Sequence, residues 1–287
     1  MVVAEDKAEF KRILMLSPTD HITLDVAVLR GDVTISYSRS GEISVFAAAR
    51  AIDATNLPTD FFDSFLTVER DGSHVKVRTA ASAVYASKAI KISYVINVPR
   101  WIEVNSTVQD GKQSVSGVMG PVKLIGGNGD IAVSYVTTSL AAKTDSGNIK
   151  VVRVGAAAEV ETGSGNINLK DIGPASVAIV RKGTGRIEMD GVSGGFTGST
   201  DAGELDARGG VFDNWDLKST SGNIRIGLPS EGKFEIDAVT RAGLLSSDNG
   251  DIDVPRDSGI RECHRKVNGG GKRVSARSDT GNIVILQ

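Results

Sequence analysis

A glycine that recurs at intervals of 18 to 20 residues constrains the fold of this chain more than any other feature of its sequence. Aligned on that glycine, the sequence after residue 125 contains eight repeats, at Gly129, Gly147, Gly165, Gly185, Gly203, Gly222, Gly250 and Gly281. The successive intervals are 18, 18, 20, 18, 19, 28 and 31 residues. Repeats of this kind are typical of solenoids, in which each repeat buries its apolar side chains by stacking on its neighbours.

Apolar residues occupy fixed positions in these repeats. Two residues after the glycine stand Ile131, Ile149, Ile167, Ile187, Leu205, Ile224, Ile252 and Ile283, and four residues after it stand Val133, Val151, Leu169, Met189, Ala207, Ile226, Val254 and Ile285. The residue between these two columns is mostly polar, which predicts a strand with one buried and one solvated face. Apolar residues seven and five positions before the glycine predict a second strand. A further column at Val136, Val154, Ile172 and Val192 predicts a third inward face and a roughly triangular coil.

The turn at the glycine has its own signature. Asn or Asp follows the glycine in several repeats, as at Gly147, Gly165 and Gly222, which favours a bend with positive φ. Ser or Thr stands three residues before the glycine, at Thr144, Thr162, Thr200, Ser219, Ser247 and Ser278. Stacked on successive turns, these hydroxyl groups can bond to the backbone of the neighbouring turn.

Together these patterns predict an all-β fold: a single-stranded parallel β-helix, or β-solenoid, with right-handed winding as the commoner hand. We expect one domain over residues 1–287, with residues 1–100 as an N-terminal cap with irregular opening turns. Residues 101–287 are expected to form regular repeats, with insertions near residues 227–249 and 255–280. Within the cap, Thr59–Leu66 is predicted as a short capped helix. An antiparallel sandwich or barrel is the alternative, but its strands recur roughly every 8–12 residues.

The order of these motifs resembles a known family. Phe10–Arg50 contains Gly-Asp-Val-Thr-Ile and Ile-Ser-Val, and an Asn-Val-Pro step at residues 97–99 precedes the Ser-Gly-Asn-Ile turns. Together with the closing Gly269–Gly271 and Thr280–Ile283, this order is similar to that of the bacterial DUF4097 family, whose members are provisionally named adhesins. The resemblance covers nearly the whole chain and implies an exported or envelope-associated β-helix protein. Its motifs specify turns and core, so it implies no catalytic residues.

Composition narrows the classes of partner. The chain has 33 Lys and Arg against 35 Asp and Glu, a net charge of −2, so we expect no nucleic-acid partner. Cys263 is the single cysteine, which excludes an intrachain disulfide. No apolar stretch is long enough to cross a membrane as a helix, and the N-terminal sequence contains no signal peptide. The compartment stays open between the cytoplasm and an envelope protein whose leader has been removed.

Short motifs in the sequence suggest metal or nucleotide binding, but each lacks a residue or a geometry that the binding requires. Gly126–Asp130 is similar to a calcium-binding nonapeptide, but its Asp comes one position early and nothing repeats at nine residues. Gly269–Lys272 lacks the first Gly and the Ser or Thr of a P-loop. Cys263 and His264 are adjacent, so they face opposite ways on an extended chain. We therefore expect no cofactor and no metal site.

The best candidate for catalysis is an acidic patch. Glu188 should stack on Asp206, with Glu204 beside them, and β-helix enzymes that act on polysaccharides use stacked carboxylates for acid–base chemistry. However, Arg186 and Arg225 fall in the same columns, so ordinary ion pairing between turns explains the carboxylates. No aromatic platform for a sugar is evident, because Phe196 and Trp215 fall in inward columns. The sequence therefore predicts a protein without catalytic residues.

Basic residues gather in the longest interval between repeats, and we name Arg261, Arg265, Lys266, Lys272 and Arg273 as a candidate site for a polyanion, with a solvated loop as the simpler interpretation. The apolar strand Ile283–Leu286 ends the last repeat. It either pairs with a second copy, which we favour, or is covered by the two insertions.

These observations favour a non-enzymatic, adhesin-like binding or structural module of the bacterial cell envelope. The alternatives are a cytoplasmic solenoid that assembles into a scaffold and, less favoured, a polysaccharide-active β-helix enzyme.

Overall fold

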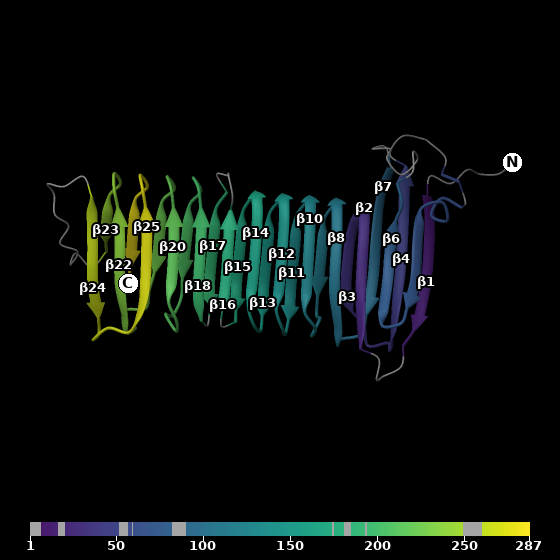
Figure 1. Ribbon diagram of the computed structural model, residues 1–287, viewed down its shortest axis with the longest axis horizontal. Coiled ribbons are helices and arrows are strands. Elements are labelled where there is room, and N and C mark those ends of the chain that lie inside the picture. The colour runs from purple at the N-terminus through teal and green to yellow at the C-terminus, as the bar shows by residue number, and fades with distance from the viewer. Residues whose placement is uncertain are drawn as a thin grey trace. The chain divides into compact units, whose positions relative to one another are not determined.

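The computed structural model describes residues 7–16, 21–51, 57–58, 60–81, 90–173, 175–180, 185–192, 194–248 and 260–287, with the backbone alone for 175–180. It contains two compact units, Met1–Thr138 and Ser139–Gln287 (units 1 and 2). The described residues form 26 β-strands and no helix (Figure 1). The expected helix at Thr59–Leu66 is wrong: Asp60–Phe65 forms consecutive turns, with Asp63 N–H donating to Asp60 O at 3.0 Å.

Unit 1 contains two sheets of mixed direction. One has the strand order β1 (Lys7–Met15), β4 (Glu42–Ala51), β7 (Ile90–Val98), β3 (Asp32–Tyr37), β9 (Gln113–Ser116) and β11 (Ile131–Val136). The other has the order β10 (Val122–Asn128), β8 (Ile102–Asp110), β2 (Ile22–Arg30), β6 (His74–Thr79) and β5 (Leu66–Asp71). The pairs β1–β4, β4–β7 and β5–β6 are antiparallel. The remaining pairs, β3–β7, β3–β9, β9–β11, β8–β10, β2–β8 and β2–β6, are parallel.

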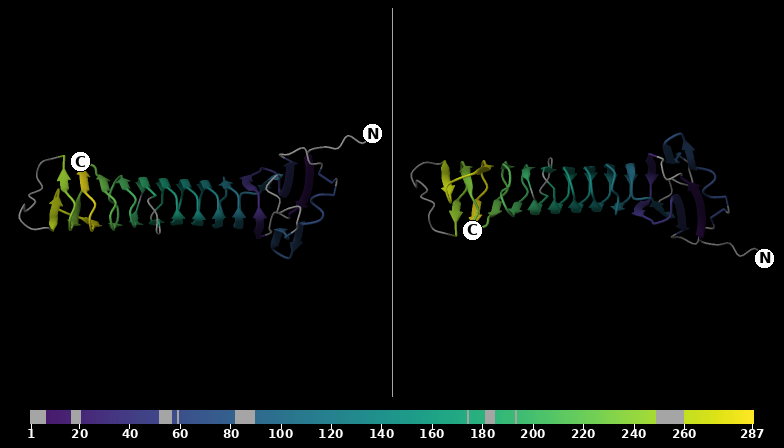
Figure 2. Two further views of the ribbon diagram at one scale, coloured as in Figure 1. Left: turned by 90° about the horizontal axis from the view of Figure 1, so that it is seen from above. Right: turned by 90° about the horizontal axis from the view of Figure 1, so that it is seen from below.

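Unit 2 is the more regular one, and its strands lie in two facing rows (Figure 2). The first sheet has the order β13 (Ile149–Val154), β15 (Ile167–Ile172), β17 (Ile187–Val192), β19 (Leu205–Arg208), β21 (Ile224–Gly227), β26 (Ile283–Leu286) and β23 (Leu245–Ser247). The second has the order β12 (Leu140–Ser146), β14 (Ala158–Ser164), β16 (Ala175–Val180), β18 (Gly195–Thr200), β20 (Trp215–Ser219), β25 (Lys272–Ser278), β22 (Phe234–Thr240) and β24 (Arg261–Val267). All neighbouring strands in these two orders pair in parallel, except β22 and β24.

The fold is therefore all-β and solenoid-like, as the repeats predict, but its sheets are mixed. The expectation of one uninterrupted parallel helix holds only in part, because the antiparallel strands β1, β4, β5 and β24 depart from it.

The repeat alignment is confirmed where unit 2 is regular. Ile149 pairs with Ile167, Ile167 with Ile187, and the column continues through Leu205 and Ile224. All five side chains are fully buried, so this column forms the core between the two sheets.

The third apolar column lies on the same strands as the first two. Val154 and Ile172 end β13 and β15, each one residue after a left-handed residue, Arg153 with φ 59° and Asp171 with φ 54°. The left-handed residue interrupts the alternation of inward and outward side chains along the strand. It and the residue before it both face outward, and the next side chain turns back toward the core. The coil consequently has two sheets, and the expected triangular section is wrong.

At the glycine column, the backbones of neighbouring turns approach one another closely. A Cβ on Gly222 would lie 1.8 Å from the carbonyl oxygen of Gly203, and one on Gly281 would lie 2.0 Å from that of Gly222. Positive φ occurs at some members, such as Gly165, but not at Gly222 or Gly281. Glycine is therefore required in this column mainly because a Cβ does not fit, and less because the backbone needs a positive φ.

The predicted hydroxyl ladder bridges the same turns. The backbone N–H of Gly281 donates to Ser278 Oγ at 2.9 Å, and Ser278 Oγ donates to the carbonyl oxygen of Gly222 at 3.3 Å. Thr240 repeats the arrangement, accepting from Gly243 N–H at 3.1 Å and donating to Gly281 O at 2.8 Å. Each hydroxyl thus satisfies two buried backbone groups at the corner of the coil.

The last turns are stacked in an order that differs from their order in the chain. The alignment at Gly250 is replaced by one at Gly243, because Leu245 pairs with Ile283 and Thr240 with Ser278. Gly250 itself lies outside the described residues. The β25–β26 turn is inserted between the β20–β21 and β22–β23 turns. Residues 234–247 and 261–278 therefore contain stacked strands, where insertions were expected.

This order changes the expectation for the last strand. β26 pairs with β21 on one edge and with β23 on the other, so it offers no unpaired edge to a second copy. The favoured route to self-association, through this strand, is therefore wrong, and coverage by the preceding segment replaces it.

We expect Ile167→Asp to lower the free energy of unfolding by several kcal/mol, because it buries a charge without a partner. The matched change Lys150→Asp, at an exposed position of β13, should alter it by less than about 0.5 kcal/mol. Urea denaturation of both variants measures the difference, and equal losses would contradict the register.

The glycine column yields a second prediction. Gly222→Ala should cost about 1–3 kcal/mol, because its Cβ would overlap the Gly203 carbonyl. Gly41→Ala serves as the control, since nothing lies within 4 Å of the added Cβ there. A Gly222→Ala variant that melts with the wild type would show that the turns can separate without cost.

Candidate functional site

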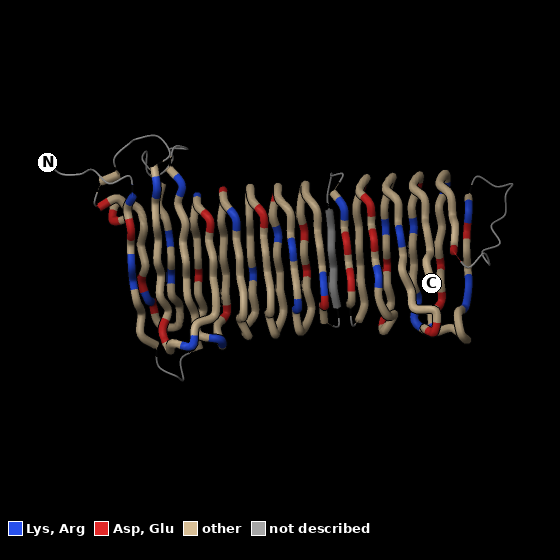
Figure 3. Tube along the Cα trace, turned by 180° about the vertical axis from the view of Figure 1, so that it is seen from behind, with Lys and Arg blue, Asp and Glu red and all other residues tan. Residues whose placement is uncertain are grey.

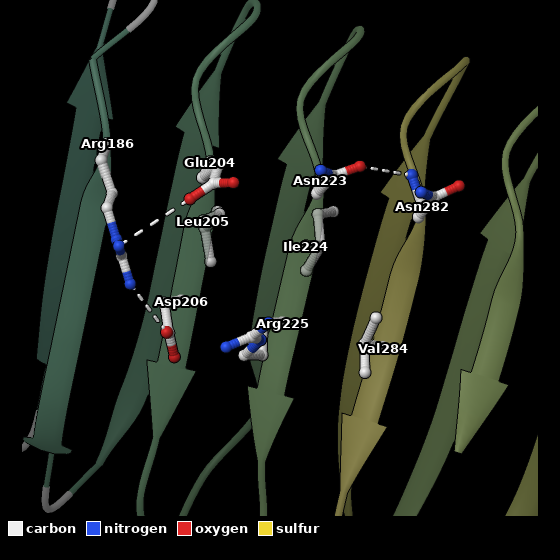
Figure 4. A pocket seen from close by; sticks show the side chains of 9 residues that line it. All are labelled: Arg186, Glu204, Leu205, Asp206, Asn223, Ile224, Arg225, Asn282 and Val284. Atoms are coloured by element: carbon white, nitrogen blue, oxygen red, sulfur yellow. Dashed lines mark hydrogen bonds and ion pairs between the residues drawn. The ribbon is translucent and has the colours of Figure 1, made fainter. Parts of the chain in front are cut away.

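The acidic patch lies in an outward column of the first sheet of unit 2. Glu188 pairs with Asp206 in register, and Asp206 pairs with Arg225 on the next strand. The expected stack of carboxylates is therefore confirmed as a neighbour relationship. Arg186 and Glu204 stand two residues earlier on their respective turns (Figure 4).

Asp206 is the one deeply buried carboxylate of this patch, with 4% of its side chain exposed. Its Oδ2 lies 3.0 Å from a terminal nitrogen of Arg186, and Arg208 donates to Oδ1 at 2.9 Å and to Oδ2 at 3.0 Å. Hydrogen bonding to Asp206, together with its charge, raises the pKa of Arg208. The carboxylate oxygens are thus directed at two guanidinium groups, an arrangement that favours structure over proton transfer.

A cavity of about 280 Å³ opens between Arg186, Asp206 and Arg225 (Figure 4). Asn223 and Asn282 line its other end, and Asn223 Oδ1 accepts from the backbone N–H of Asn282 at 2.9 Å. Asn282 Oδ1 accepts from Leu244 N–H at 2.8 Å in the same way. These asparagines fasten one turn to the next, and the opposite charges in the cavity balance one another.

The predicted polyanion residues lie on strands, which corrects the expectation of a loop. Arg261, Arg265 and Lys266 belong to β24, and Lys272 and Arg273 belong to β25. Arg265, Lys266 and Arg273 line one open groove of about 380 Å³ over β22, together with Glu235, Ile236, Asp237 and His264. We call this the basic groove.

The other two predicted residues do not join the basic groove. Arg261 pairs in register with Thr240, at the far end of β24. Lys272 Nζ lies 3.1 Å from Asp213 Oδ1. The backbone N–H of Asn214, and after it Lys272, lower the pKa of Asp213. Lys272 therefore forms an ion pair with a neighbouring turn, outside the groove.

Charges of both signs are interspersed over the strands of unit 2 (Figure 3). Within the basic groove, Lys266 lies 3.5 Å from Glu235, and His264 lies 3.2 Å from Asp237. The Lys266 side chain is 72% exposed, so its pair with Glu235 is a weak surface contact that an anionic ligand can replace.

The remaining motifs have structural explanations. Cys263 is buried, and burial raises the pKa of its thiol, which argues against a nucleophile. Across the described ranges, no three His, Cys, Asp or Glu residues are grouped so that they could hold a metal ion. Nor does any described segment form a helix with the length and apolar character to traverse a bilayer.

Trp101 is an exposed residue that the sequence patterns do not single out. Phe196 and Trp215 are buried, as expected, but Trp101 in unit 1 has 73% of its surface exposed. It stands before the regular repeats, where no column indicates which side chains face outward. Its position immediately before the apolar residue of a strand, Ile102, was the available signal.

Comparisons with known proteins agree with this architecture. The family model for Toastrack DUF4097 matches residues 20–286. No curated protein matches the chain. A solved Parabacteroides distasonis protein, provisionally named a lipid binding protein, is 11% identical with a TM-score of 0.55, over 98% of this chain and 97% of that one. At this identity the likeness concerns the fold alone.

Two solved proteins provisionally named adhesins are also similar over most of their length. The one from Bacteroides fragilis is 12% identical with a TM-score of 0.40, over 97% of this chain and 96% of that one. The one from Parabacteroides merdae is 13% identical with a TM-score of 0.36, over 98% and 96%.

If Asp206 acts as a structural anchor, Asp206→Ala should lower the free energy of unfolding by about 1–3 kcal/mol, because it removes charge-assisted hydrogen bonds at a buried site. Glu204→Ala is the control, since its side chain is 59% exposed and 3.8 Å from Arg186. That change should stay within about 0.5 kcal/mol. Equal stability of the two variants by urea denaturation would refute the anchor.

Proposed function

The chain belongs to the Toastrack DUF4097 family, and from this premise we propose a non-enzymatic, adhesin-like binding module of the bacterial cell envelope that holds an anionic polymer in the basic groove. The observation that carries the proposal is the convergence of Arg265, Lys266 and Arg273 on one groove. These side chains come from two strands, β24 and β25, on either side of β22.

The groove has the chemistry of an anion site on a stiff support. Two of its three cations are arginines, whose planar guanidinium groups can bond to carboxylate, phosphate or sulfate through two nitrogens at once. Strand pairing fixes the spacing of the charges, so little conformational entropy is lost on binding. Glu235 and Asp237 moderate the attraction, which favours a polymer that makes many weak contacts over a single small anion.

Two observations support the absence of catalysis. The best candidate acid, Asp206, is fixed between Arg186 and Arg208. The thiol of Cys263 is buried with a raised pKa. The envelope location rests on the resemblance of the chain to its family. A self-assembling scaffold is less well supported, because β26 is paired along both edges.

Retention on heparin at low and high salt tests the proposal, because binding through charges weakens as salt screens them. The wild type should be retained at low salt and released at high salt. Arg265→Ser/Lys266→Ser/Arg273→Ser should abolish retention without moving the melting temperature by more than a few degrees.

The control removes the same charge elsewhere in unit 2, with Lys143→Ser/Lys150→Ser/Lys218→Ser, and should be retained like the wild type. The double variant Arg261→Ser/Lys272→Ser changes two residues outside the basic groove, and it should also keep most of the retention on heparin. A wild type that passes through the column at low salt, or a control that loses retention equally, would refute the basic groove as the site.

A further inference from the structure

Trp101 lies in a groove of about 260 Å³ on unit 1, where three neighbouring strands of one sheet, β2, β8 and β10, begin. His21 and Thr23 come from the turn of β2, Trp101 and Glu103 from the turn of β8, and Gly120 and Pro121 from the segment that precedes β10. An indole with 73% exposure contributes little to the core, so packing does not account for a tryptophan at this position.

The backbone beneath the indole is firmly held. Met119 N–H donates to the carbonyl oxygen of Arg100 at 2.8 Å, and Val104 N–H donates to that of Pro121 at 2.9 Å. Gly120 packs so closely that an added Cβ would lie 2.0 Å from the Ile102 carbonyl oxygen. The groove thus lies where paired strands begin, and backbone hydrogen bonds hold the segments that precede β8 and β10.

Polar groups continue outward from the indole along the same face. Thr23 and Glu103 are partners in register on β2 and β8, and both line the groove. Asn105 Nδ2 donates to Glu103 Oε1 at 3.3 Å and to Asp25 Oδ1 at 3.2 Å. His74 Nδ1 lies 2.6 Å from Asp25 Oδ2, which extends the network to β6. These bonds link Glu103, through Asn105, to Asp25 on β2 and His74 on β6.

We propose that this groove is a binding site for a neutral saccharide, with Trp101 stacking on one sugar ring and Glu103 and Thr23 bonding to its hydroxyl groups. A pyranose combines an apolar C–H face with a rim of hydroxyls that both donate and accept. The groove offers the complement, an aromatic face beside a carboxylate acceptor and a hydroxyl that does both.

Other ligand classes fit less well. The carboxylates of Glu103 and Asp25 repel an anionic ligand, and the polar network leaves an acyl chain against hydrogen-bonding groups. A quaternary ammonium group is usually enclosed by several aromatic rings, whereas the described residues that line this groove include one indole, Trp101, and no Phe or Tyr. The site lies on a different unit from the basic groove and concerns an uncharged ligand, so it does not rest on the function proposed above.

The chain carries its own spectroscopic reference, because it contains two tryptophans in opposite environments. Trp101 is exposed, whereas Trp215 is 1% exposed and donates its indole N–H to Gly194 O at 3.3 Å. Fluorescence and acrylamide quenching therefore report separately on the groove and on the core. The probes are neutral oligosaccharides of glucose, mannose, galactose and N-acetylglucosamine.

A bound sugar should shift the Trp101 emission to the blue and protect it from acrylamide, while the Trp215 signal stays constant. In Trp101→Phe, which keeps an aromatic face, calorimetry should still detect binding, and the remaining fluorescence should not respond. Trp101→Ala should weaken binding at least about tenfold, as expected for a tryptophan at the centre of a contact. Glu103→Ala should also weaken it.

Phe212→Ala is the matched control, because Phe212 is 69% exposed but lies on unit 2. It should bind the sugar like the wild type, and Trp101→Ala should keep the melting temperature and heparin retention of the wild type. The proposal is overturned if no sugar in the panel alters the Trp101 signal, or if Trp101→Ala binds as tightly as the wild type. A response only to anionic oligosaccharides or to choline would equally overturn it.

Discussion

The contact on which unit 2 depends is the approach of one turn's glycine to the backbone of the next. At Gly203, Gly222 and Gly281 the space for a Cβ is already taken by a neighbouring carbonyl oxygen. This proximity lets the hydroxyls of Ser278 and Thr240 bridge successive turns and keeps the apolar columns in register. A wider spacing would separate the strands and leave buried N–H and C=O groups without partners.

In a repeated backbone of this kind, the residues that stabilise the fold are separate from the residues that can bind a ligand. The inward columns hold the turns together, while the outward positions vary freely from Lys150 and Asn168 to Glu188 and Arg225. Binding groups can therefore be placed wherever neighbouring turns bring them side by side, as at the basic groove and at Trp101. The same logic explains why the family motifs describe turns and core and say little about a ligand.

The sequence predicts the features that recur in every turn. It does not predict a feature for which two local signals compete. Ile167 and Ile187 were placed correctly, because every turn repeats their environment. The choice between Gly243 and Gly250 could not be made locally, since each follows a hydroxyl residue by three positions. Thr240 is positioned by a bond to Gly281, 41 residues later in the chain. The five basic residues are close in sequence, but strand geometry groups only Arg265, Lys266 and Arg273.

The inserted β25–β26 turn also has a consequence for biosynthesis. A solenoid whose turns stack in chain order can grow one layer at a time as it leaves the ribosome. Here the layer formed by residues 234–247 cannot take its place until residues 272–286 have emerged, because those residues lie between it and the β20–β21 turn. In the nascent chain, residues 234–247 must therefore stay undocked until residues 272–286 are available. A premature stop after residue 247 would remove the interior layer formed by β25 and β26. It would leave the layer formed by β22 and β23, which normally covers that interior layer.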